Sequence, residues 1–355
     1  MNLFSNGTIN QLRLKNRIVR SATWEGMSAA DGQPTEQLID LYRTLATGGV
    51  GLLISSYSYV RADGKQMIGK LGMDNDNLIP ALQKLTTAVH EAGGKTFCQL
   101  VHAGGLAEVD APLAPSALPE KTHVRAMTPQ DIAEIVSAFA TAAARAQSAG
   151  FDGVQLHGAH GYLINQFLSP LTNQRQDDYG GSLENRSRFL SEVYQAVRAA
   201  VGPDYPVTIK LTASDNIDGG FILAEALTVA QQLDSRGIDA IEVSSGTAAA
   251  GDLNPVRQKI DSLEQEAYNA ANAQAIKQVV KVPVVTVGGI RSPQLAEDLL
   301  DRGDADFVAL SRPLIREPDL ANKWQADFSH RASCISCNGC FRPGFKEGGI
   351  RCVVD

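Results

Sequence analysis

Eight short apolar runs, each followed by a longer stretch with helical spacing, constrain the fold more than any other feature of the sequence. Most of the runs are continuously apolar, as expected of parallel strands that are buried on both faces. They lie at Arg17–Arg20, Val50–Ser55, Thr96–Val101, Gly153–His157, Val207–Leu211, Ala240–Ser244, Val284–Val287 and Phe307–Leu310.

The segments between the runs show the spacing of amphipathic helices. Thr128 precedes Pro129 and Asp131, which is a typical helix start, and helical spacing continues to about Ser148. The same spacing covers Ser182–Val201, Ala224–Ser235, Glu264–Val279 and Pro293–Leu300. An open, doubly wound sheet is the alternative, but eight strand–helix units exceed the size of most open sheets. We therefore predict a (β/α)₈ TIM barrel over residues 1–327 and a cysteine-rich tail, residues 328–355, packed on it.

Composition and charge exclude several classes of protein. The chain has 355 residues, of which 44% are hydrophobic and 20% charged, which is typical of a globular protein. A net charge of −7 argues against a nucleic-acid partner. No apolar run approaches the ~20 residues of a membrane helix, and the first residues lack a secretion signal. We expect a cytoplasmic protein without a membrane partner, either a monomer or a homo-oligomer.

Polar residues stand where several runs end, which is where barrels of this type carry their active sites. Lys210 ends an apolar run, and a buried lysine needs an anionic partner, which a cofactor that is negative when reduced would supply. Gly288-Gly289 follows the seventh run and Ser311-Arg312 the eighth. Glycine N–H groups beside a cation predict a phosphate site. A long loop, Gly104–Arg125, follows the third run and is a candidate lid.

The stretch from His157 to Tyr162 holds two imidazoles and a phenol within six residues. Two histidines can share a zinc ion, but these are not spaced i, i+4 and no acidic residue adjoins them. We favour His157 and His160 as paired hydrogen-bond donors to a substrate oxygen, with Tyr162 as a weak acid.

Several motifs resemble those of the old yellow enzyme family of FMN-dependent ene-reductases. The matching segments are Leu14–Val19, Gln99–Gly104, His157–Pro170, Asn173–Arg175, Asp178–Arg186 and Gly288-Gly289. The match covers nearly the whole chain. The cysteine tail makes the chain similar to the bacterial branch that contains dienoyl-CoA reductase, enoate reductase and trimethylamine dehydrogenase.

The resemblance implies a role for each matching residue. His157 and His160 would bond the activating oxygen of an alkene, and Tyr162 would protonate its α carbon. Lys210 would stabilise the anionic reduced flavin. The other expected FMN contacts are Ser21, Ala22, Thr23 and Tyr57 at the ring, Gln99 at the pyrimidine edge, and Gly288, Gly289, Ser311 and Arg312 at the phosphate.

The activity implied by the resemblance is reduction of activated C=C bonds in enones, enoates or nitroalkenes. NAD(P)H would reduce FMN, and hydride would then pass from flavin N5 to the β carbon of the substrate. Ser244-Ser245-Gly246 lacks the histidine of dienoyl-CoA reductase, which argues against that reaction. Trp24 replaces a redox-tuning cysteine of one branch. The alternatives are an FMN-dependent dehydrogenase or demethylase of an amine or alicyclic compound, and a non-catalytic flavin or metal redox sensor.

Four of the five cysteines crowd the tail with the spacing C-x2-C-x2-C-x11-C. They are Cys334, Cys337, Cys340 and Cys352. Four thiolates at such spacing predict a 4Fe–4S cluster or a zinc site, and free thiols or disulfides are the alternative. A cluster would imply an external electron-transfer protein as partner.

Overall fold

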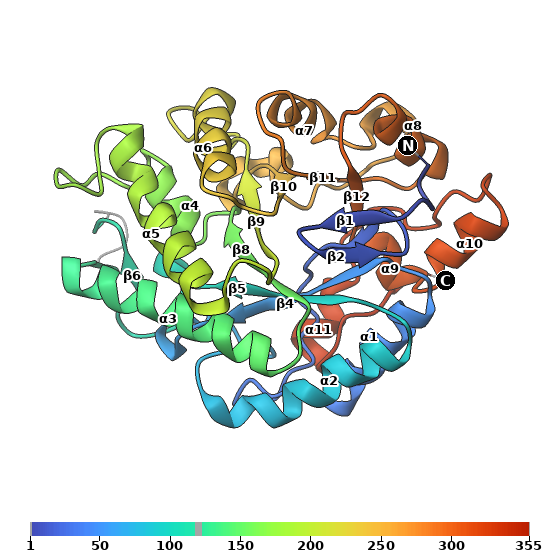
Figure 1. The fold of residues 1–355 in the computed structure, drawn as a ribbon, viewed down its shortest axis with the longest axis horizontal. Coiled ribbons are helices and arrows are strands. Elements are labelled where there is room, and N and C mark those ends of the chain that lie inside the picture. Colours follow the sequence, from blue (N-terminus) through green and yellow to red (C-terminus); the bar gives the residue numbers. More distant parts are fainter. Residues whose placement is uncertain (1, 118–122, 355) are drawn as a thin grey trace.

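The computed structural model describes residues 2–117 and 123–354, which include a closed barrel of eight parallel strands (Figure 1). The strands follow one another around the barrel in chain order, and the last pairs with the first. The predicted (β/α)₈ barrel is therefore confirmed. Its strands are β3 (Ile18–Arg20), β4 (Leu52–Tyr59), β5 (Thr96–Val101), β8 (Gly153–Gly158), β9 (Val207–Thr212), β10 (Ala240–Ser244), β11 (Val284–Val287) and β12 (Phe307–Leu310).

Helices surround the strands on the outside (Figure 1). Thr128 and Asp131 form a complete capping box at the start of the third helix, as the sequence predicts. The helices are α1 (Glu36–Thr47), α2 (Ile79–Glu91), α3 (Pro129–Ser148), α4 (Leu163–Leu168), α5 (Leu183–Val201), α6 (Leu223–Ser235), α7 (Ala270–Lys277), α8 (Pro293–Asp301), α9 (Arg312–Arg316), α10 (Leu320–Ala326) and α11 (Phe341–Glu347). None of the helices in the described ranges is long and apolar enough to cross a bilayer.

An N-terminal hairpin closes one end of the barrel. Strands β1 (Gly7–Ile9) and β2 (Leu12–Leu14) pair antiparallel. Ile9 and Leu14 belong to one buried apolar cluster with Phe97, Val285 and Phe307 from the barrel strands. This apolar cluster fills the end at which the strands begin, whereas the predicted site residues lie toward the other end.

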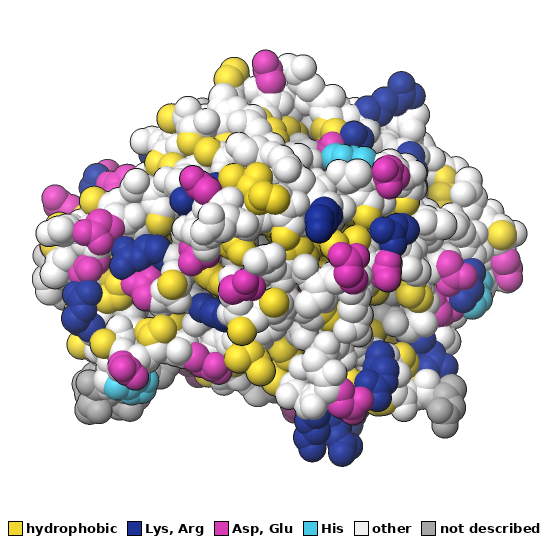
Figure 2. Space-filling model, turned by 90° about the horizontal axis from the view of Figure 1, so that it is seen from below, with side chains coloured by type: hydrophobic (Ala, Val, Ile, Leu, Met, Phe, Trp, Pro, Cys, Tyr) yellow, Lys and Arg dark blue, Asp and Glu magenta, His cyan; other side chains and the backbone are white. Residues whose placement is uncertain are grey.

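The loop expected over Gly104–Arg125 contains short elements. A 3₁₀ turn, η3 (Gly104–Leu106), opens it, and two short parallel strands, β6 (Leu113–Ala114) and β7 (Arg125–Ala126), bring its arms together. Residues 118–122 of this loop lie outside the described residues. On the face of the molecule in Figure 2, acidic and basic side chains are interspersed rather than segregated.

The helix predicted over Glu264–Val279 is wrong in its first part. A 3₁₀ turn, η5 (Leu263–Gln265), is followed by a break, and α7 begins only at Ala270. Ala267 in the break has φ +51°, which no α-helix allows. Asn269 accepts a hydrogen bond from Ser245 Oγ at 2.6 Å and donates one to the Val287 carbonyl at 2.7 Å. These bonds draw the segment toward the ends of β10 and β11 and interrupt the helix.

The tail contacts the barrel at several points. The rings of Trp24 and Phe345 lie 4.4 Å apart between centroids, and the Ile350 N–H donates to the Glu25 carbonyl at 2.8 Å. Glu317, after α9, accepts hydrogen bonds from the Ser333 N–H and from His330 Nε2, both at 2.7 Å. The domain boundary at residues 327/328 stays a prediction.

These contacts predict acid sensitivity of the tail. Burial would raise the pKa of the Glu317 carboxyl, but hydrogen bonds from Ser333 and His330 outweigh burial and lower the pKa to about 2. A lowered carboxyl pKa stabilises the fold above the ordinary value of 4.5 and loses that contribution as pH falls toward 2. We expect Glu317→Gln to lower the urea midpoint at pH 7 and to flatten its decline in acid. An exposed carboxyl on α2 serves as control through Glu91→Gln, and equal acid profiles of wild type and Glu317→Gln would contradict the expectation.

Candidate active site

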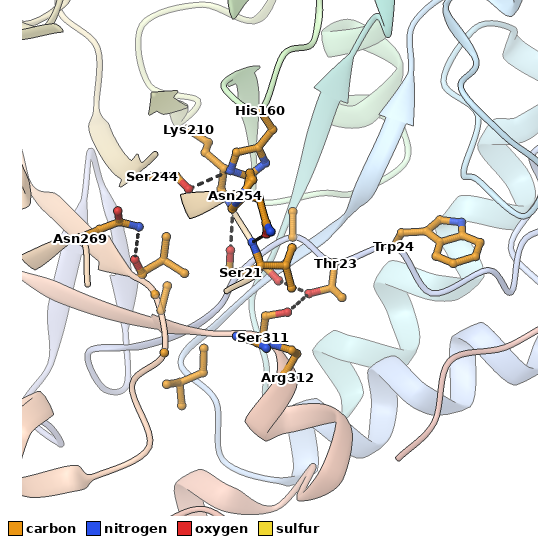
Figure 3. Close-up of a pocket in the computed structure, with 18 of the residues that line it drawn as sticks. Ser21, Thr23, Trp24, His160, Lys210, Ser244, Asn254, Asn269, Ser311 and Arg312 are labelled. Carbon is orange, nitrogen blue, oxygen red and sulfur yellow. Dashed lines mark hydrogen bonds between the residues drawn. The ribbon is translucent and has the colours of Figure 1, made fainter. Parts of the chain in front are cut away.

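A cavity of about 460 Å³ lies at the C-terminal ends of the barrel strands (Figure 3). Its size is within the range of small-molecule and cofactor sites. Twelve of the predicted site residues line it together: Ser21, Ala22, Thr23, Tyr57, His157, His160, Tyr162, Lys210, Gly288, Gly289, Ser311 and Arg312. Gln99 is not among the lining residues. The tail contributes Ser336 and Phe341 to the wall.

Four aromatic side chains form one wall of the cavity. The His157 ring meets Tyr162 edge-on at 4.8 Å and His160 at 5.1 Å, measured between centroids. Tyr57 lies 5.4 Å from Tyr162. His157 lies near the end of β8, and His160 lies in the turn that follows, beside the same cavity. The backbone of His160 is in the left-handed region, with φ +64°. Positive φ is found in only a few per cent of residues other than glycine, although histidine adopts it more often than most, and such residues cluster at functional sites.

Both imidazoles are neutral near pH 7. Burial and the neighbouring charge of Lys210 lower the pKa of His160 to about 3. Burial, followed by His160, Lys210 and Lys70, lowers the pKa of His157 well below its usual value. His157 Nδ1 accepts the Ala159 N–H at 3.4 Å, so the ring proton lies on Nε2, which is a donor. His160 Nε2 contacts Ser244 Oγ at 2.8 Å.

Tyr162 is a buried phenol with one hydrogen-bond partner in the described residues. Its hydroxyl donates to Gln66 Oε1 at 2.7 Å, and Lys70 Nζ donates to the same oxygen at 2.7 Å. Lys70 Nζ lies 3.0 Å from the centroid of the Tyr57 ring. Burial raises the pKa of Tyr162, so the group holds its proton until a stronger base meets it. Gln66 and Lys70 were not predicted as site residues, because they lie after β4 in no recognisable motif.

The partner of Lys210 is a carboxylate of the chain itself, which corrects the expectation that a cofactor supplies it. Lys210 Nζ lies 3.0 Å from Glu242 Oε1. Ser21 Oγ accepts from Lys210 at 2.6 Å and donates to Glu242 at 2.6 Å. Glu242 lies on β10 directly opposite Lys210 on β9. Glu242 was not predicted as a site residue, although a charged residue inside a buried apolar strand is a signal of such a partner.

Two amides continue this polar group across the barrel interior. Gln155 Nε2 donates to Glu242 Oε2 at 2.8 Å, and Gln99 Nε2 donates to Gln155 Oε1 at 2.7 Å. Because a carboxylate only accepts, it fixes the orientation of both amides. Gln99 Oε1 is buried and has no partner among the described atoms. Contact of Gln99 with the flavin stays a prediction.

The opposite side of the cavity from Lys210 carries the glycine pair and two arginines. Figure 3 shows Lys210 and His160 on one side and Ser311 and Arg312 on the other, with Ser21 and Thr23 between them. Gly288 and Gly289 have φ +139° and +73°, and the Tyr268 ring lies against both. Arg291 also lines the cavity, and its buried Nε has no hydrogen-bond partner in the described chain. These groups suit a phosphate.

The four tail cysteines line one small cavity of about 20 Å³ beside Arg312 and Arg316. Each is a free thiol. Within the described ranges, no three histidine, cysteine or acidic side chains are arranged to hold a metal ion. The structure therefore brings the predicted ligands together but does not support a metal centre.

Comparison with known proteins decides the family. The model of the NADH:flavin oxidoreductase / NADH oxidase family matches residues 2–330. The chain belongs to this family, which is that of old yellow enzyme. It is 40% identical to an NADH oxidase of Thermoanaerobacter brockii over 100% of this chain and 56% of the relative. It is also 40% identical to an NADPH dehydrogenase of a Geobacillus species, over 89% of this chain and 91% of the relative.

Solved structures agree with this assignment. A 2-naphthoyl-CoA reductase complex superimposes with a TM-score of 0.92 at 29% identity, covering 100% of this chain and 57% of that chain. The old yellow enzyme homologue from Zymomonas mobilis gives a TM-score of 0.79 at 28% identity, covering 95% and 96%. The chain thus spans about half the length of several of its long relatives, including a metal reductase of Desulforamulus reducens (53%).

The residues present fit the family's cofactor, FMN. Lys210 at one side suits the pyrimidine part of the ring, and Gly288, Gly289, Arg291 and Arg312 at the other suit the phosphate. Arg291 Nε lies 3.7 Å from Glu266 Oε1 but makes no hydrogen bond in the described residues, so it is a donor that a phosphate oxygen would satisfy.

A pair of glycine variants tests this fit. Gly289 and Gly303 have φ +73° and +74°, so alanine is strained equally at both positions. A Cβ at Gly289 lies 3.2 Å from the Tyr268 ring, whereas a Cβ at Gly303 meets nothing within 4 Å. We expect Gly289→Ala to weaken FMN binding about tenfold or more and Gly303→Ala to leave it unchanged, as measured by fluorescence of released FMN. Equal effects of the two variants would contradict the placement of the phosphate.

Proposed function

We propose that this protein is an FMN-dependent NAD(P)H oxidoreductase that reduces activated C=C bonds. One observation carries the proposal: two neutral imidazoles and a protonated phenol share a cavity wall with Lys210 and a site suited to FMN phosphate. Such groups polarise an oxygen and supply a proton, which an electron-poor alkene requires when it accepts hydride. The relatives named NADH oxidase and NADPH dehydrogenase support a nicotinamide as electron donor.

FMN, when bound, would supply the hydride chemistry, accepting two electrons from NAD(P)H and passing them to the alkene. The residues of the chain do the rest. His157 Nε2–H and His160 would bond the carbonyl or nitro oxygen and stabilise the charge that develops there. Tyr162 would break its O–H bond and give the proton to the α carbon. Gln66 and Lys70 hold the Tyr162 hydroxyl in place.

The alternative of an amine dehydrogenase is disfavoured by Lys70. A solved histamine dehydrogenase superimposes with a TM-score of 0.86 at 29% identity, so the fold alone does not separate the two activities. An aromatic wall attracts cationic amines through the faces of its rings. Here Lys70 Nζ already lies over the face of Tyr57, 3.0 Å from the ring centroid. It is also 5.7 Å from the centroid of the Tyr162 ring. A neutral, electron-poor substrate suits this wall better.

Separate half-reactions test the assigned roles. We expect Tyr162→Phe to slow alkene reduction at least tenfold, because the proton donor is lost, while NAD(P)H reduces the flavin at an unchanged rate. His157→Ala should in addition weaken alkene binding. Anaerobic stopped-flow spectroscopy measures both steps, with cyclohexenone and a nitroalkene as probes. If neither variant slows the alkene step, Tyr162 and His157 do not have these roles.

We also propose that the tail thiols of Cys334, Cys337, Cys340 and Cys352 bind metal, although no reaction step is derived from it. The C-x2-C-x2-C-x11-C spacing supports this proposal. All four cysteines line one cavity, but among the described residues no three side chains are arranged as metal ligands. Protein purified without oxygen should contain about four iron atoms per chain, with a single zinc ion as the alternative. Absence of both metals would leave the cysteines as free thiols.

Two further proposals follow from the same features. Free thiols at all five cysteines suit a reducing compartment, which supports the cytoplasm as location. An external electron-transfer protein would be a partner only if the tail holds an iron–sulfur cluster.

A further inference from the structure

Glu242 is the buried charge that the proposed mechanism leaves unused. It lies in the barrel interior, where its side chain is fully shielded from solvent. It does not line the cavity, so no substrate or cofactor reaches it directly. A carboxylate in such a place is costly unless it is paired and hydrogen-bonded.

The chain satisfies Glu242 completely. Oε1 accepts from Ser21 Oγ at 2.6 Å and lies 3.0 Å from Lys210 Nζ, while Oε2 accepts from Gln155 Nε2 at 2.8 Å. In the described part of the chain, Lys210 is the one cation within ion-pair distance. Ser21 follows the end of β3, Gln155 lies on β8 and Lys210 on β9, so the carboxylate on β10 is held from three other parts of the barrel.

This arrangement changes the charge that a bound cofactor meets. A lone lysine beside the cavity would present one positive charge, which favours gain of electrons by a neighbouring flavin. Lys210 paired with Glu242 presents a net charge of zero. In a water-poor interior, a carboxylate 3.0 Å from the ammonium offsets much of its field.

We propose that Glu242 is a positioning residue that holds Lys210 and cancels its charge, and that it thereby lowers the two-electron reduction potential of bound FMN. The inference rests on the proposed function only in that FMN occupies the cavity beside Lys210. A lower potential makes the reduced enzyme a stronger hydride donor to an alkene and a weaker acceptor from NAD(P)H. Glu242 thus shifts driving force from the reduction of FMN by NAD(P)H to the reduction of the alkene by FMN.

The first test replaces the carboxylate by the amide of the same shape. In Glu242→Gln, Lys210 loses its counter-charge, and the ratio of affinities for reduced over oxidised FMN should rise at least tenfold. For a two-electron couple this is about 30 mV. The potential is measured on the holoenzyme by dye-coupled anaerobic reduction. An unchanged or lower potential in Glu242→Gln overturns the proposal.

A matched control separates charge from packing. Thr286 on β11 is a fully buried barrel residue whose hydroxyl has no partner in the described structure. Thr286 faces the helix layer, because its neighbours Val285 and Val287 point into the barrel. Thr286→Val alters the buried packing of a strand next to β10 without altering charge, so the potential should stay at the wild-type value. A shift as large as that of Glu242→Gln would mean that any disturbance of buried packing has this effect, and would overturn the proposal.

A second variant keeps the proposal testable if Glu242→Gln does not fold, since an unpaired buried charge is strongly destabilising. Lys210→Met/Glu242→Gln removes both charges together and leaves the net charge at zero, as in the wild type. The ratio of its affinities for reduced over oxidised FMN should stay within tenfold of the wild-type ratio, which is about 30 mV in potential. A potential that is lower by more than about 30 mV would show that Lys210 acts uncompensated in the native protein, and would overturn the proposal.

The outcomes also distinguish this inference from the proposed function. Protein that binds no FMN, or that binds FMN but reduces no activated alkene, contradicts the proposed function. If the protein binds FMN and reduces an activated alkene, but Glu242→Gln leaves the reduction potential unchanged, only the role of Glu242 is contradicted.

Discussion

Closure of eight strands into a barrel is the constraint on which the candidate site depends. Because the strands of this closed barrel are all parallel, they end at one rim, and residues far apart in the chain meet there. Ser21, Lys210 and Glu242 form one hydrogen-bonded group although 221 residues separate the first from the last. The N-terminal hairpin strengthens this asymmetry, because Ile9 and Leu14 fill the other end of the barrel with apolar side chains.

The buried polar group of Lys210, Glu242, Gln155 and Gln99 lies directly above an apolar layer of the barrel interior. Along β5 and β10, an apolar residue of the lower layer, Phe97 or Ala240, precedes a polar one by two positions, Gln99 or Glu242. A strand alternates its faces, so both members of each pair point inward, one layer above the other. The upper layer is polar and internally satisfied, and it forms a base on which a charged cofactor can be held with defined electrostatics.

Much of the fold followed from the sequence because continuous apolar runs and helix caps are local signals. All eight strands were found, although β4 runs on to Tyr59 with a register shift after Ile54. The broken helix before Ala270 was not found, because tertiary bonds of Glu266 and Asn269 override local helical spacing. Twelve cavity residues were predicted, since they sit at strand ends or in motifs. Gln66, Lys70 and Glu242 were missed, because their roles depend on which residues face them, and spacing does not reveal that.

The central claim is that hydride and proton reach the alkene from different sources, the second through Tyr162. Isotope labelling tests it most directly. With NADPH as donor and cyclohexenone in deuterium oxide, exchange of the Tyr162 hydroxyl with solvent should place deuterium at the α carbon, while the new hydrogen at the β carbon comes from NADPH. Mass spectrometry and NMR of the product read both positions. A product without deuterium at the α carbon, or a failure to reduce the alkene at all, would contradict the account.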